Sequence, residues 1–220
     1  MEYYKYLDLA VAVCAIIGFI YGLVVKTKIR RALYYKMIVA AVGTMALGRL
    51  YEFVYMWVSE EQFERFQIGT LVVIATFLFF FTANYGTMDH LGDNGSKEFR
   101  KYRIIAAAAP IIITASYVPV YLSDSNLITK ISYAAIWISI MIASYYALKH
   151  LILPDVDFGV IRCIRGYNLL VLCYGLLSVT ERIALLYDAK IVTWITCILS
   201  AVVALLLIPV LKKGAAKWII

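Results

Sequence analysis

Apolar residues occur along this chain in runs of about twenty, which is the length a helix needs to cross a hydrocarbon layer roughly 30 Å thick. Short polar clusters separate the runs. A membrane β-barrel would instead show apolar and polar residues alternating in segments of about ten. The pattern therefore predicts an all-α fold, a polytopic integral membrane protein whose residues 1–220 form a single domain, a seven-transmembrane-helix bundle. The expected spans are residues 7–25, 32–58, 67–86, 104–122, 131–148, 166–187 and 191–211.

Basic residues gather in every second connection between the spans, whereas the alternate connections are acidic or nearly neutral. The basic segments hold Lys26, Lys28, Arg30 and Arg31; Lys97, Arg100, Lys101 and Arg103; Lys149, Arg162 and Arg165; and Lys212, Lys213 and Lys217. Cytoplasmic connections of membrane proteins carry such an excess of Lys and Arg. We therefore expect the N-terminus outside and the C-terminus inside. The net charge of +7 then reflects topology and attraction to anionic lipids, and we expect no nucleic-acid partner.

Composition supports a membrane environment. Hydrophobic residues make up 64% of the chain and charged residues 16%, which excludes an ordinary soluble domain because its surface would remain largely apolar. The first apolar run continues to Val25 and is followed by four basic residues, as in a retained span rather than a cleaved signal peptide. We expect a multi-pass protein of the plasma membrane, with the lipid bilayer as a partner.

Two charged pairs interrupt the apolar runs. Arg49 and Glu52 lie in the second span, and Glu181 and Arg182 lie in the sixth. A charge in mid-bilayer costs at least about 2.5–3.5 kcal/mol, so such residues are expected to face the bundle interior and neutralise one another. An offset of 132 residues aligns the two spans with six identities and pairs Arg49 with Glu181. We predict an interhelical Arg49–Glu181 pair, with Glu52 and Arg182 completing a net-neutral layer of four charges.

This layer has two interpretations. At 1.5 Å per residue, Arg49 and Glu181 lie about 9 Å below the outer boundary, so the four charges could line an outward-facing polar pocket that binds a ligand. They could equally fasten two helices together, with the long Arg side chains reaching the interface.

Aromatic residues form a second group near the outer boundary. Tyr51, Tyr117, Trp137 and Trp194 could wall a ligand cavity together with the charges. Aromatic side chains also form belts at membrane interfaces and fill helix bundles, so packing is the alternative role.

The expected inner loop at residues 86–103 contains Asp89, His90 and Asp93, which are residue types that bind cations or accept protons. Gly92, Asn94, Gly95 and Ser96 predict a turn nearby. An ordinary solvated loop and a docking surface for a cytoplasmic partner are both compatible with this segment.

Missing residues exclude several classes. The seventh span has no lysine for a retinal Schiff base, and no Asp-Arg-Tyr or Asn-Pro-x-x-Tyr element of G-protein-coupled receptors is present. The two histidines, His90 and His150, both lie in expected loops, which excludes bis-histidine haem and three-histidine zinc sites within the bundle. We expect no cofactor, no metal and no catalytic residues, because no nucleophile and base share one depth.

These features favour a seven-helix sensor or receptor-like protein. Its ligand would be a small molecule that enters from the outer side, and its cytoplasmic surface would signal to a protein partner, since no soluble output segment is evident. A small-solute transporter built from two three-helix repeats and a linker helix is the main alternative. The third possibility is an accessory membrane subunit.

Overall fold

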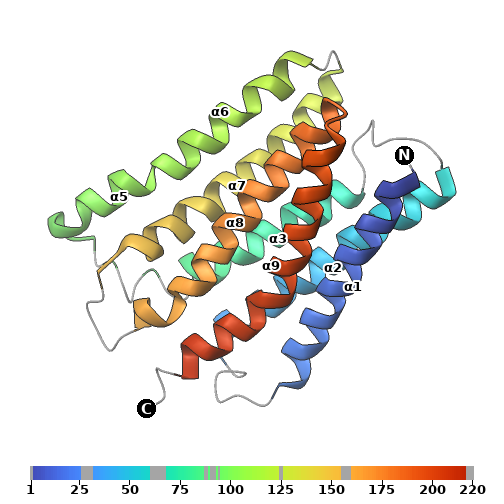
Figure 1. The fold of residues 1–220 in the computed structure, drawn as a ribbon. Helices are drawn as coiled ribbons and strands as arrows, with labels where there is room; N and C mark the ends of the chain where they lie inside the picture. The colour runs from blue at the N-terminus through green and yellow to red at the C-terminus, as the bar shows by residue number, and fades with distance from the viewer. Residues whose placement is uncertain are drawn as a thin grey trace.

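The computed structural model describes residues 2–25, 32–59, 68–86, 89, 93, 95–123, 126–154 and 160–216. In these residues the regular structure is helical throughout (Figure 1). The elements are α1 (Glu2–Val24), α2 (Leu33–Ser59), α3 (Ile68–Tyr85), the 3-10 turn η2 (Lys97–Phe99), α5 (Arg100–Ala106), α6 (Ala108–Ser123), α7 (Leu127–Ile152), α8 (Val160–Leu186) and α9 (Lys190–Ala216).

Seven helices in the described part of the chain are long and apolar enough to cross a membrane, with η2, α5 and α6 together counted as the fourth. The predicted all-α architecture and the number of spans are therefore confirmed, and the chain is a multi-pass membrane protein. Several helices extend past the apolar runs. For example, α7 begins at Leu127, where the Asn126 side chain accepts a hydrogen bond from the Ile128 amide at 3.0 Å. Such a cap satisfies an N–H that the helix itself leaves unpaired.

The fourth span is interrupted. Pro110 has no N–H to donate to the carbonyl four residues earlier, that of Ala106, and the helix changes from α5 to α6 at Ala107. Pro119, by contrast, lies inside the continuous helix α6.

Six helices close into a ring, in the order α1, α2, α3, α7, α8 and α9, with α9 packed against α1. The fourth span lies outside this ring, where α6 packs on α7 and α8 (Figure 1). The ring consists of two groups of three consecutive helices, α1–α3 and α7–α9, with the same internal arrangement. The middle helix of each packs between the other two: α2 between α1 and α3, and α8 between α7 and α9. The 132-residue offset relates α2 to α8, and these two helices face each other across the ring where Arg49 contacts Glu181.

A layer of buried aromatic side chains fills the middle of the ring. Phe77 and Phe80 on α3 pack against Tyr174 on α8, with ring centroids 5.4 and 6.4 Å apart, and Phe80 also meets Tyr167 at 6.2 Å. All four side chains are at most 3% exposed. The end of the bundle where α1 begins is the N-terminal end. The aromatic layer lies between the polar side chains near this end and those near the opposite end.

Candidate functional site: a charged layer beside a polar cavity

The charged residues of α2 and α8 meet at one depth near the N-terminal end. The Arg49 guanidinium donates through both terminal nitrogens to the two oxygens of the Glu181 carboxylate. The Nη1 atom of Arg49 also lies 3.4 Å from Glu52 Oε2, one helical turn away on the same face. The predicted interhelical pair is therefore present.

The adjacent residues Glu181 and Arg182 point in different directions, as expected for neighbours about 100° apart on a helix. Glu181 is 4% exposed, and one of its oxygens lies 3.7 Å from Cys197 Sγ on α9. Arg182 points toward α2 and α7: its Nη2 lies 3.8 Å from Glu52 Oε1, and its guanidinium lies 6.0 Å from the ring centre of Tyr133. Four helices thus contribute to one connected arrangement around α2 and α8.

Asp8 on α1 is part of the same layer, although it was not among the residues expected there from the sequence. Its Oδ1 accepts a hydrogen bond from Arg49 Nη1 at 2.9 Å. The expectation of a net-neutral layer of four charges is therefore corrected. Asp8, Glu52 and Glu181 oppose Arg49 and Arg182, so the formal charge of these described residues is −1. Asp8 interrupts the first apolar run as Arg49 does the second, but its place close to the end of the span resembles an ordinary flanking charge.

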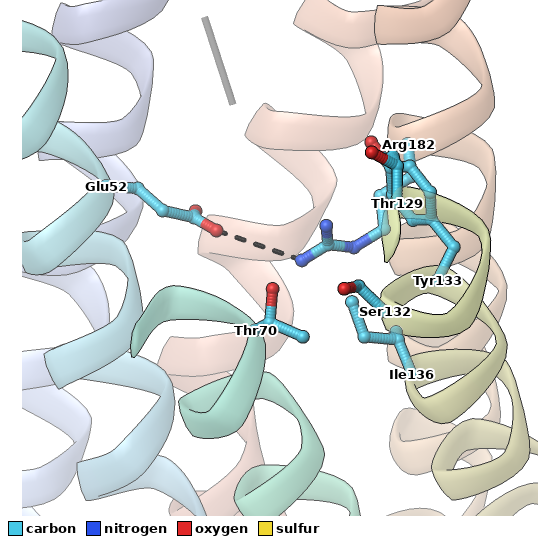
Figure 2. Close-up of a pocket in the computed structure, with 7 residues that line it drawn as sticks. All are labelled: Glu52, Thr70, Thr129, Ser132, Tyr133, Ile136 and Arg182. Atoms are coloured by element: carbon cyan, nitrogen blue, oxygen red, sulfur yellow. Dashed lines mark ion pairs between the residues drawn. The ribbon is translucent and has the colours of Figure 1, made fainter. Parts of the chain in front are cut away.

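A small polar cavity lies beside the layer, between α2, α3, α7 and α8 (Figure 2). The space that the centre of a water molecule can reach is about 30 Å³. Since about 10–15 Å³ by this measure holds one water molecule, two or three would fit. Figure 2 shows Glu52 and Arg182 on opposite sides of this space, with the Thr70 hydroxyl directed toward it. The lining residues are Glu52, Thr70, Thr129, Ser132, Tyr133, Ile136 and Arg182.

A second space of about 10 Å³ lies between α2, α3 and α8 and is also bordered by Arg49 and Glu52. Its polar wall includes Thr44 and Thr76, whose hydroxyls hydrogen-bond each other at 3.0 Å. This volume accommodates about one water molecule at most.

The four aromatic residues of the sequence analysis take separate positions. Trp137 donates from Nε1 to Ser116 Oγ at 3.0 Å, and its ring centre lies 5.8 Å from that of Tyr117. Tyr117 donates to the Lys130 carbonyl at 2.8 Å. Tyr51 stacks on Tyr55.

Trp194 is 43% exposed on α9. Neither of the two cavities described above is lined by these four residues, whereas Tyr133 lines the larger one. The contacts of Tyr117 and Trp137 attach α6 to α7 and have no direct part in the cavity.

A second polar cluster lies at the opposite end of the bundle, around Lys149 on α7. Its ammonium group lies 2.7 Å from both Asp89 and Asp93, and Arg103 Nη1 lies 2.8 Å from Asp93. His150, which is fully buried, lies 3.2 Å from Asp89 through Nε2. Asp89 and Asp93 are therefore held by buried partners and do not belong to a simply solvated loop. His90 lies outside the described residues.

Electrostatics favour the charged forms of these two loop carboxylates. Burial raises the pKa of Asp89, but hydrogen bonds from His150 and Lys149 outweigh it and hold the pKa below its ordinary value. Burial likewise raises the pKa of Asp93, and hydrogen bonds from Lys149 and the Gly95 amide lower it by more. Gly95 has φ = 78°, in the left-handed region that glycine adopts without strain. Gly92 and Asn94, which belong to the turn expected here, lie outside the described residues.

Asp8, Glu181 and Cys197 bring three potential metal-ligand atoms within 4.8 Å of one another. Arg49 donates hydrogen bonds to both of these carboxylates. The group therefore binds a guanidinium in this structure, and its chemistry is that of an ion pair.

A comparison of this chain with models of known protein families, with curated proteins and with solved structures finds no match.

Proposed function

We propose that this protein is a sensor or receptor-like protein of the plasma membrane, with its N-terminus outside and its C-terminus in the cytoplasm. In this proposal the cavity of Figure 2 receives a small polar ligand from the outer side. The observation that carries the proposal is the cavity itself, because side chains of α2, α3, α7 and α8 converge there. Ligand sites in helix bundles are commonly built from a few polar groups on facing helices.

Two helices connect the cavity to the cluster at the cytoplasmic end. Thr70 and Asn84 lie at opposite ends of α3, and Ser132 and His150 lie toward opposite ends of α7. Asn84 Oδ1 lies 3.4 Å from His150 Nδ1. A ligand that changes the spacing of α3 and α7 at the cavity would therefore change the support of the loop that carries Asp89. A cytoplasmic or membrane protein partner would detect that change.

A small-solute transporter is the second candidate, and the ring of two equivalent helix triplets favours it, since many transporters are built from structural repeats around a central site. The aromatic layer of Phe77, Phe80 and Tyr174 argues for the sensor. It fills the space between the cavity and the opposite end of the bundle, where a transported solute would have to pass.

The testing experiment measures ligand-induced shifts of the unfolding temperature for purified protein across a library of small polar compounds. Thr70→Val and Ser132→Ala change the lining of the cavity without removing a charge. Ser139→Ala is the matched control, because Ser139 is a buried serine of the same helix that also donates to a backbone carbonyl but does not line the cavity.

A shift that persists in Ser139→Ala and disappears in Ser132→Ala would support the ligand site. If every shift survives in both cavity variants, the cavity is not the site and the charged layer only fastens the helices. Flux of the active compound across sealed vesicles then separates the candidates: a sensor binds it without transport.

A further inference from the structure

We infer that the ligand of this cavity is a small monovalent cation, coordinated by the Glu52 carboxylate and the hydroxyl groups beside it. The inference rests on the proposed function for the location of the site and adds the chemical class of its ligand. Alkali ions, ammonium and methylammonium share the chemistry in question, which is one positive charge surrounded by oxygen atoms.

The charge balance of the layer favours a cation. Three carboxylates and two guanidiniums leave a formal charge of −1 in the described residues, at a depth where an unbalanced charge is costly. A monovalent cation would neutralise the layer, whereas an anion would double the imbalance. Lys5 lies one helical turn before Asp8, but its ammonium group is placed over the Trp57 ring, 5.8 Å from the ring centre.

Glu52 is the carboxylate with the weakest contacts in the layer. Glu181 and Asp8 each accept a short hydrogen bond from Arg49. Glu52 Oε2 is 3.4 Å from Arg49, and Glu52 Oε1 lies 3.8 Å from Arg182, beyond hydrogen-bond range. Glu52 is nevertheless 9% exposed and lines the cavity, with its carboxylate directed across it (Figure 2). Glu52 Oε1 therefore accepts no direct hydrogen bond from Arg182 and can accept a further partner from the cavity.

The remaining walls supply oxygen atoms. Ser132 donates its hydroxyl proton to the Ile128 carbonyl at 2.8 Å, so its oxygen lone pairs are available to a cation. The Thr70 hydroxyl is directed toward the same space (Figure 2). Carboxylate and hydroxyl oxygens are hard ligands that suit alkali ions and also accept hydrogen bonds from ammonium.

Size restricts the ligand further. A space that holds two or three water molecules admits an alkali ion with one or two waters, an ammonium ion or methylammonium. Larger amines would require the helices to move apart. The Arg182 guanidinium is directed toward Glu52 across the cavity (Figure 2), but the 3.8 Å separation of Nη2 from Glu52 Oε1 is too long for a direct hydrogen bond.

The test measures the unfolding temperature of the purified full-length protein in chloride salts of sodium, potassium, ammonium and methylammonium. Each salt is titrated against N-methylglucamine chloride at constant ionic strength and constant pH. The variants are Glu52→Gln and Asp8→Asn, and Asp188→Asn is the control, because that carboxylate is largely exposed. Asp8→Asn neutralises the layer without altering the cavity lining.

A saturable rise in the unfolding temperature is expected for wild type and Asp188→Asn with at least one of the four cations. The identity of that cation separates alkali-ion from ammonium-type ligands. The apparent affinity should fall by about tenfold or more in Glu52→Gln and by a smaller factor in Asp8→Asn. A change in intrinsic tryptophan emission that depends on the stabilising cation gives a second readout in natively folded variants if Glu52→Gln lowers stability.

Equal unfolding temperatures in all salts would overturn the inference, as would an unchanged affinity in Glu52→Gln. In particular, if lowering the pH raises the unfolding temperature and none of the four salts does, a bound proton and not a cation neutralises the charge of the layer. The proposed function is tested separately. A library compound whose effect depends on Ser132 would uphold the sensor while the cation inference fails, and the absence of any Ser132-dependent ligand would remove both.

Discussion

Arg49 on α2 and Glu181 on α8, 132 residues apart, form a two-bond ion pair across the centre of the helix ring. Arg49 is 9% exposed and also contacts Asp8 and Glu52, so one guanidinium links α1, α2 and α8. Arg182 has a much weaker attachment, with its nearest carboxylate oxygen at 3.8 Å. The two arginines of the layer therefore have different roles: Arg49 organises the bundle, and Arg182 borders the cavity.

The first prediction is that Arg49→Ala destabilises the protein by about 3–5 kcal/mol, because it leaves buried carboxylates without their cation. Arg182→Ala should cost about 1 kcal/mol or less, since its ion pair is long and partly exposed. Equilibrium unfolding in detergent or bilayer measures both values. Equal losses of unfolding free energy in the two variants would contradict this division of roles. A double-mutant cycle of Arg49→Ala with Glu181→Ala should give a coupling free energy of about 1–3 kcal/mol.

The second prediction concerns the contact between α1 and α9. A Cβ atom at Gly18 would lie 2.7 Å from the backbone oxygen of Ala204, whereas one at Gly48 would meet only the Val72 side chain, at 3.2 Å. Alanine improves helix propensity by about 1 kcal/mol, and overpacking costs about 1–3 kcal/mol. Because the Gly18 contact is with backbone that cannot move aside easily, the upper part of that cost applies, and Gly18→Ala should lower stability by up to about 2 kcal/mol, whereas Gly48→Ala should leave it unchanged or raise it. Thermal unfolding of both variants compares them, and a neutral Gly18→Ala would mean that α1 and α9 separate at little cost.

The third prediction is a pH dependence of the loop around Lys149. Asp89 and Asp93 have folded-state pKa values below the ordinary value of about 3.9. Their contribution to stability is fully present above that ordinary value, and it is lost as the pH falls through the lower folded-state values. The protection factors for hydrogen exchange of residues 95–103, which correct for the intrinsic pH dependence of exchange, should therefore fall as the pH is lowered below about 4. Lys149→Met should reduce this change, and Lys212→Met, at a lysine outside the cluster, should not. An identical profile in Lys149→Met would exclude Lys149 as the cause.

The fourth prediction tests membrane orientation. Lys190 and Lys97 are both exposed and lie near opposite ends of the bundle. In a variant with its four cysteines replaced, Lys190→Cys should react with a membrane-impermeant maleimide in intact cells. Lys97→Cys should react only after permeabilisation. The reverse pattern would place the cavity on the cytoplasmic side and remove the basis for a ligand that enters from outside.

Sequence alone determined the number and approximate limits of the spans, because the length of an apolar run is a local property set by the thickness of the bilayer. It also placed Arg49 and Glu181 at one depth, because the rise per residue of a helix is fixed. The rotation of about 100° per residue in a helix then required Glu181 and Arg182 to point to different neighbours.

Only the tertiary structure decided which neighbours those were. The participation of Asp8, the convergence of Thr70 and Ser132 on Glu52, and the ion pair of Asp89 with buried Lys149 all depend on the order of helices in the ring and on the rotation of each about its axis. Small hydroxyl residues are common in membrane helices and give no local signal of a shared cavity. Rotation and neighbour order are set by packing of the whole bundle, so no segment of the sequence specifies them by itself.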